Sequence, residues 1–229
     1  MNVPWPLWGL VVRTPRLELR PDDDVGLLEL AEEALLGVHP KDEMPFFEPW
    51  TDAPEDQLAT NLLQFHWKQR SEFTPESWSV NFLVRSEGRV VGTQQLSARG
   101  FATVREVTSG SWVGQRHQGN GYGSEMRAAV LMLAFDHLGA TQARSASFED
   151  NPASLAVSHK LGYVADGTER RQRRGERAQL RRLVLTRERF EEKRPEWDVD
   201  VTGLSECRPM LVGEFPGGTG DAEAASSGE

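Results

Sequence analysis

Short runs in which apolar and polar residues alternate recur along the first half of the chain. This period of two is typical of strands that are buried on one face. Glu87-Gly88 separates two of these runs, and a two-residue loop that ends in glycine favours a β-hairpin. The strands predicted in this half lie at residues 10–12, 17–20, 78–84 and 89–96.

Two other stretches of the first half repeat apolar residues at the spacing of a helix. The first follows the three aspartates at 22–24, which can cap its N-terminus. The second is predicted to carry Leu58, Leu62 and Phe65 on one face. We interpret His66 in that helix as structural, since a lone helical histidine is seldom a ligand.

Strands and helices are interleaved in the second half of the chain. A long helix is predicted from about Ser124 to His137, and Asn151-Pro152 starts another, because asparagine is a favoured N-cap and proline fits the first helical position. The strands predicted here lie at residues 107–113, 142–148, 163–165 and 178–185. This order predicts an α/β or α+β fold, in which helices cover both faces of a mixed sheet.

The composition, 38% hydrophobic and 27% charged over 229 residues, is that of a soluble globular protein. Its apolar runs are shorter than the roughly 18 residues of a membrane span, and its N-terminal residues lack the features of a signal peptide, so we expect no membrane partner. A single cysteine, Cys207, cannot form an internal disulfide, which favours the cytoplasm. Its late position in an irregular segment argues against a catalytic role.

Residues 1–195 are predicted to form one domain and residues 196–229 a C-terminal extension. Pro195 and Pro209 interrupt any regular pattern, so the extension is expected to be largely irregular. Its last residues are too poor in apolar side chains to pack, which predicts a disordered end.

A formal net charge of −9 argues against nucleic acid as a partner and mildly favours a cationic acceptor such as an amine. The one basic run, at residues 170–177, is interpreted as a solvated hairpin turn. Contact with an acidic acceptor or with an anionic acyl group such as succinyl is the functional alternative.

Three glycines at alternate positions, Gly119, Gly121 and Gly123, lie where the strand at 107–113 gives way to a helix. Glycine accepts the left-handed angles of a tight turn, and amides at a helix N-terminus favour anions. The spacing is not that of the dinucleotide fingerprint, and the lysine of a Walker A loop is absent. The loop is therefore predicted to hold a diphosphate through its main chain; the alternative is a loop that only packs closely on the sheet.

Two motifs of the chain resemble those of the GNAT superfamily of N-acyltransferases. Residues 116–121, Arg-His-Gln-Gly-Asn-Gly, fit the acyl-CoA-binding loop Gln/Arg-x-x-Gly-x-Gly/Ala. About thirty residues later, Asn151 and Ser154 fit Asn-x-x-Ser, and residues 160–163 fit Lys-x-Gly-Phe/Tyr. The resemblance extends over roughly residues 8–190 and is closest to the branch of ribosomal-protein N-terminal acetyltransferases. It implies the GNAT fold, with a mixed, mostly antiparallel sheet of about seven strands.

The resemblance implies an acyl-CoA-dependent N-acyltransferase that uses no metal. It would move an acetyl group from acetyl-CoA, or a larger acyl group such as succinyl from succinyl-CoA, to a primary amine of a small molecule or peptide by direct attack in a ternary complex. The alternative is a CoA-binding sensor or interaction module that has lost the chemistry. Many relatives form dimers, so a homodimer is an open alternative as well.

The resemblance also assigns roles to residues. Many members carry a tyrosine seven residues after the asparagine as general acid; because that position is Ser158 here, the hydrogen bond to the departing thiolate is assigned to Ser154. The main chain of residues 109–113 would stabilise the oxyanion. For the general base we favour Glu106, acting through water, over Glu149 and Asp150.

A larger set of residues is assigned to binding. The aromatic loop that contains Phe46, Phe47 and Trp50 is either a hydrophobic lid over the core or a wall of the acceptor site. The residues expected to bind the coenzyme are Ser111, Trp112, Val113, Gln118, Gly119, Asn120, Gly121, Tyr122, Gly123, Ser124, Asn151 and Ser154.

Overall fold

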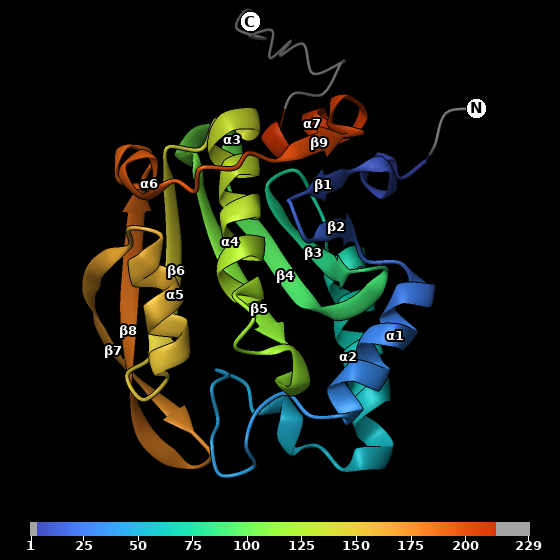
Figure 1. The fold of residues 1–229 in the computed structure, drawn as a ribbon, viewed down its shortest axis with the longest axis vertical. Coiled ribbons are helices and arrows are strands. Elements are labelled where there is room, and N and C mark those ends of the chain that lie inside the picture. The colour runs from blue at the N-terminus through green and yellow to red at the C-terminus, as the bar shows by residue number, and fades with distance from the viewer. Residues whose placement is uncertain (1–3, 214–229) are drawn as a thin grey trace, which may run out of the picture.

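A nine-stranded sheet runs through the residues that the computed structural model describes, 4–213 (Figure 1). Its order is β7-β8-β6-β5-β4-β3-β2-β1-β9, and only the neighbours β5 and β6 are parallel. The mixed, mostly antiparallel sheet confirms the predicted fold class, and β9 extends it beyond the expected number of strands. The strands are β1 (Val11–Arg13), β2 (Glu18–Pro21), β3 (Ser77–Ser86), β4 (Arg89–Arg99), β5 (Glu106–Val113), β6 (Gln142–Phe148), β7 (Val164–Arg173), β8 (Glu176–Thr186) and β9 (Asp200–Thr202).

Helices cover both faces of this sheet (Figure 1). Leu83 of β3 packs on one face against α1 and α2, whereas its neighbours Phe82 and Val84 pack on the other face, in the cluster that contains α4. Successive side chains of a strand point to opposite faces, so this alternation fixes both layers. The α-helices are α1 (Asp24–Leu35), α2 (Glu55–Ser71), α3 (Phe101–Val104), α4 (Tyr122–Met132), α5 (Pro152–Lys160), α6 (Arg187–Lys193) and α7 (Leu204–Val212).

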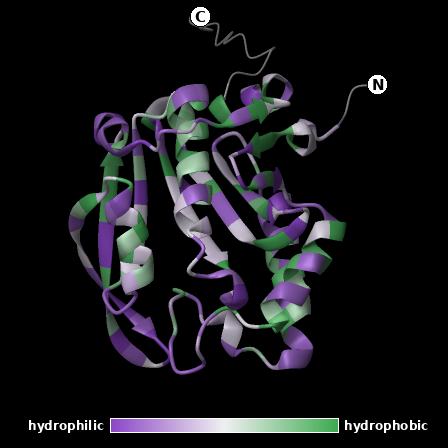
Figure 2. Cartoon of the chain, in the orientation of Figure 1, coloured by the Kyte–Doolittle hydropathy of each residue, from purple (hydrophilic) through white to green (hydrophobic). Residues whose placement is uncertain are grey.

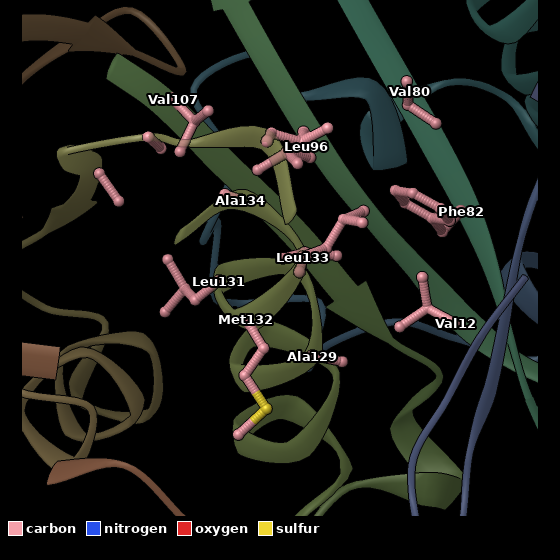
Figure 3. Close-up of a cluster of buried hydrophobic side chains, with 14 of the residues drawn as sticks. Val12, Val80, Phe82, Leu96, Val107, Ala129, Leu131, Met132, Leu133 and Ala134 are labelled. Carbon is pink, nitrogen blue, oxygen red and sulfur yellow. The ribbon is translucent and has the colours of Figure 1, made fainter. Parts of the chain in front are cut away.

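The helix α4 lies at the centre of the larger core cluster. Met132 and Leu133 belong to one cluster of buried side chains with Phe82 and Leu96 of the sheet (Figure 3). A π-helical turn, η4 (Leu133–Leu138), continues α4, and Gly139 follows its end. Figure 2 shows the opposite character at the far end of β7 and β8, where the turn between them is hydrophilic.

Within residues 4–213, no helix combines the length and the hydropathy that crossing a membrane requires.

The buried face of α2 differs from the prediction at one position. Leu58 and Leu62 are buried, but Phe65 is half exposed and His66 takes its place in the interior. Residues 58, 62 and 66 lie four apart, which aligns them on one side of a helix. His66 is 2.6 Å from a carboxylate oxygen of the buried Asp22, so the prediction of a structural role for this histidine fits its contacts.

Residues 200–212 of the predicted C-terminal extension are ordered rather than irregular. The strand β9 pairs with β1, and α7 buries Cys207 and Leu211 against the core. The indole of Trp78 donates a hydrogen bond to the Leu211 carbonyl oxygen. The division of the chain at residue 195 stays a prediction, and the predicted disordered end lies outside the described residues.

Candidate active site

The parallel strands β5 and β6 pair over only three residues each. Their ladder joins residues 106–108 to 142–144 and then stops, although both strands continue. A cavity of about 750 Å³ occupies the place where further pairing would be, lined by residues 108–113 of β5 and 144–147 of β6. The β6-facing main-chain groups of residues 109–113 therefore face a space that a ligand can enter.

The glycine-rich loop forms one end of the cavity. Gly119 and Gly121 have φ angles of 78° and 80°, which a residue with a Cβ rarely adopts. Within residues 4–213, the amides of Gly119, Asn120 and Gly121 make no hydrogen bond. Gly121 caps α4 without a side-chain hydrogen bond, and among the described residues the amides of Tyr122 and Gly123 also lack partners, whereas the Ser124 amide donates to the Gly121 carbonyl oxygen at 3.2 Å. The loop thus presents consecutive N–H groups, as predicted for an anion site.

Side chains of the loop hold it in this shape. The amide nitrogen of Gln118 donates to the carbonyl oxygens of Val38 and Val113, at 2.8 and 2.9 Å. The amide nitrogen of Asn120 donates to the carbonyl oxygen of His117, at 3.1 Å. Gln118 lines the cavity, whereas Asn120, which was predicted to bind the coenzyme as well, does not.

Two ion pairs anchor the loop to the rest of the molecule. Arg16 donates to the carbonyl oxygen of Asn120 at 3.0 Å and pairs with the buried Glu125 of α4. On the other side, Arg116 makes a bidentate pair with Glu33 of α1, which is 2% exposed. A bidentate guanidinium–carboxylate pair fixes orientation as well as distance.

Asn151 and Ser154 lie across the cavity from the loop, at the start of α5. The Asn151 side-chain oxygen accepts from the Ser154 amide at 3.0 Å, which confirms the N-cap. In the described residues, the Asn151 amide nitrogen and the Ser154 hydroxyl have no hydrogen-bond partner, and both residues line the cavity. Asn151 can therefore cap the helix and bind a ligand through different atoms.

Three aromatic residues and a histidine make a row on the α1–α2 face. Trp112 of β5 lies 5.6 Å from Trp50, and Trp50 lies 5.3 Å from Phe46, between ring centroids. Phe46 and His39 contact edge to face, at 5.5 Å. Phe46 and the half-exposed Phe47 line the cavity, whereas Trp50, between Trp112 and Phe46 in the row, does not.

The arginines of the β7–β8 turn clasp the loop that carries these aromatic residues. Arg174 makes a bidentate pair with Asp52, at 2.6 and 2.8 Å, and its guanidinium lowers the pKa of that carboxyl group. Arg173 donates to the Met44 carbonyl oxygen and pairs with Asp150, whose pKa it lowers likewise. The turn was predicted to be solvated, but at these two positions its arginines bind other parts of the chain.

The carboxylates considered as general bases are all paired. Glu106 lies outside the cavity and accepts from Arg144 at 2.8 Å and from Gln142 at 2.9 Å. Glu149 pairs with Arg181, and Asp150 with Arg173. The geometry gives Glu106 no contact with the cavity, because the residues of β5 that line it begin two positions later, at Thr108.

Among the cavity residues that were not predicted, one is a buried charged residue. Arg127 of α4 is only 5% exposed, lines the cavity and has no carboxylate partner in the described residues. Its guanidinium donates to the hydroxyls of Ser158, at 2.9 Å, and Ser111, at 3.4 Å, and its Nε has no partner. Burial lowers the pKa of this guanidinium, which nonetheless stays protonated as arginine does in proteins.

Comparisons with known proteins agree with this arrangement. The family model described as "Acetyltransferase (GNAT) domain" matches residues 16–164. RimJ of Mycobacterium smegmatis, in complex with CoA-disulfide, superposes with a TM-score of 0.62 at 16% identity, covering 88% of this chain and 94% of its own.

Two further acetyltransferase structures have similar scores. A spermidine N-acetyltransferase, the SpeG chimera from Vibrio cholerae and hSSAT, has a TM-score of 0.59 at 17% identity, covering 77% of this chain and 98% of its own. RimL, a ribosomal L7/L12 alpha-N-protein acetyltransferase in complex with coenzyme A, has a TM-score of 0.58 at 16% identity, covering 77% and 97%. At these identities the structures share the fold.

Proposed function

The chain belongs to the GNAT family of acetyltransferases, and we propose that it transfers an acetyl group from acetyl-CoA to a primary amine by direct attack in a ternary complex. The observation that carries the proposal is the glycine loop, whose amides face one end of a cavity between two separated strands. The loop would hold the diphosphate, and residues 109–113 would run beside the pantetheine arm.

In the proposed reaction the neutral amine attacks the carbonyl carbon of the thioester, the carbon–sulfur bond breaks and the electron pair leaves on sulfur. Main-chain amides of residues 109–113 can stabilise the oxyanion, since donors aimed at developing charge lower the barrier. The Ser154 hydroxyl, which lines the cavity without a partner in the described residues, would donate to the departing thiolate.

We further propose that the acceptor is an α-amino group. An alkyl ammonium of pKa about 10.4 is disfavoured in its neutral form at pH 7 by roughly 4–5 kcal/mol, whereas an α-amino group of pKa about 8 is disfavoured by only roughly 1 kcal/mol. The three carboxylates considered as bases are engaged by arginines, which favours an acceptor that needs little help to lose its proton. RimL, named for α-N-protein acetylation, and the spermidine enzyme mark the two alternatives within this fold.

Release of free thiol from acetyl-CoA tests the proposal, with short peptides that bear a free N-terminus compared against polyamines at equal concentration. We expect the peptides to react faster near pH 7 and the difference to shrink as the pH rises. A protein that binds CoA but releases no thiol with either class would support the sensor alternative. Faster release from succinyl-CoA than from acetyl-CoA would change the acyl group and leave the reaction type in place.

A further inference from the structure

Arg127 is a buried cation for which the described part of the chain provides no anion. Burying an arginine without a carboxylate is costly, and the cost is tolerated where a ligand supplies the negative charge. In this cavity the guanidinium faces only hydroxyl partners, Ser111 on β5 and Ser158 on α5, and its Nε is left without one. The site is therefore built for an anion that is absent from the polypeptide.

The position of Arg127 narrows the choice of anion. Its helix α4 packs against both β5 and α5. The guanidinium bridges these two elements through Ser111 and Ser158. Arg127 lies six residues beyond Gly121, about 9 Å along the helix at 1.5 Å per residue. The diphosphate would bind at the loop amides, and along the pantetheine arm that extends from it the atom that becomes anionic in the reaction is the sulfur.

We propose that Arg127 stabilises the thiolate that coenzyme A becomes when the acetyl group leaves. This inference rests on the proposed function and names the residue that takes up the negative charge. When the carbon–sulfur bond breaks, its electron pair stays on sulfur, and the amine's surplus proton passes to solvent. The sulfur is then anionic beside the guanidinium until it gains a proton from water.

The neighbours of Arg127 leave this charge uncompensated. The groups that accept from it are the neutral hydroxyls of Ser158 on α5 and Ser111 on β5, and Ser109 and Ser154, which line the same cavity, are neutral as well. The titratable neighbour is Tyr163, just after α5: burial raises its pKa, and the Arg127 charge opposes that shift. A neutral tyrosine does not cancel a guanidinium charge. The pKa of a bound thiol is thus the quantity that the Arg127 charge would shift.

The test is the pKa of the CoA thiol in the complex, followed by the ultraviolet absorbance of the thiolate. An opposite charge within hydrogen-bonding range lowers a pKa by about 1–3. We expect the wild-type complex to titrate that far below the ordinary thiol value of about 8.5, and Arg127→Met to restore the ordinary value. Affinity for CoA relative to desulfo-CoA, measured by calorimetry, should then rise with pH in the wild type alone.

Kinetics supply an independent measurement. Arg127→Met should lower kcat about 10- to 100-fold with little change in the KM for acetyl-CoA, because the charge acts after the bond begins to break. Arg127→Lys should recover part of that loss. Arg99→Met, which removes an exposed arginine outside the cavity, is the control and should change neither quantity.

The outcomes distinguish a failure of the inference about Arg127 from a failure of the proposed function. Arg127→Met should fold at least as well as the wild type, since it removes a buried charge that lacks an anion. Equal thiol pKa values in both proteins would overturn the role of Arg127 while leaving acetyl transfer intact. Preferential binding of succinyl-CoA that Arg127→Met abolishes would also overturn it, by assigning the cation to an acyl carboxylate. Failure of the wild type to bind CoA would defeat the proposed function itself.

Discussion

Gly119→Ala separates the cost of a strained backbone from the cost of a lost ligand contact. Gly119 has a φ of 78°, and a Cβ built on it would meet no atom within 4 Å. Gly88, in the β3–β4 turn, has a φ of 80° and equally open surroundings. The two glycines thus differ in one respect, which is that Gly119 lines the cavity.

The magnitudes follow from these facts. Holding alanine in the left-handed region costs about 1–2 kcal/mol, so both substitutions should lower the free energy of unfolding by the same amount. At Gly119 the strain would also turn the amides away from the diphosphate, and the new methyl group would occupy the space where the ligand approaches. The loss of one charge-assisted hydrogen bond, about 1.5–3 kcal/mol, raises Kd by about 10- to 150-fold.

Urea unfolding measures the first effect, and calorimetric titration with CoA measures the second. We expect Gly88→Ala and Gly119→Ala to agree in stability and to differ in Kd. If Gly119→Ala binds CoA within about threefold of Gly88→Ala, the amides of the loop do not carry the diphosphate. The reasoning from loop geometry to coenzyme binding would then be refuted.

Three other perturbations test contacts around the site and the core. Arg116→Ala leaves the buried Glu33 carboxylate without its guanidinium, so urea unfolding should show a loss of about 2 kcal/mol that shrinks in a Glu33→Gln background. Gly203→Ala should destabilise the chain by about 2 kcal/mol more than Gly88→Ala, because its Cβ would lie 1.9 Å from the Gly9 carbonyl oxygen; equal losses would speak against the docking of β9 and α7. Burial raises the pKa of the Cys207 thiol to about 12 from 9.0, so the unfolded chain loses this proton first and the free energy of unfolding should fall above about pH 9, by up to about 1.4 kcal/mol per pH unit. In a pH series of urea unfolding, Cys207→Ala should lack that part of the slope.

The elements with strong local signals were predicted closely. The strand β6 has the predicted bounds, and α5 begins at Pro152 with Asn151 as its cap. Both depend on interactions between near neighbours in the chain, such as an asparagine oxygen that accepts from an amide three residues on. The glycine loop belongs to this group, because its positive φ angles require glycine wherever the rest of the chain lies.

The features that depend on distant partners were missed. Nothing near β9 in the sequence indicates that it pairs with β1, and Pro209 argues against a helix that tertiary packing nonetheless stabilises. The internal partners of Arg173 and Arg174 lie on an aromatic loop and a helix start far earlier in the chain, so the residues of the turn alone could not reveal the clasp.

Arg127 had a signal in the sequence that could have identified it. Residues 126–135 are apolar at every position but this one, and in the structure each of them is at most 5% exposed. A helix that is apolar all round is buried on every side. A charged residue inside such a run is therefore a candidate for a site.

The separation of β5 from β6 gives the contacts of Arg173 and Arg174 a structural role beside the cavity. Main-chain groups of β5 that face β6 beyond the ladder give up sheet hydrogen bonds, and such groups are costly unless a partner satisfies them. Beyond that ladder, no β5–β6 strand pairing in the described residues fixes the distance from β5 to β6. Arg173 and Arg174 connect the β7–β8 turn to the loop on the far side of the opening, which holds the two halves of the sheet at a set distance. The pantetheine arm of CoA carries amides that can complete the interrupted ladder. Under the proposed function, these amides would give the main-chain groups of β5 the partners that the short ladder leaves out.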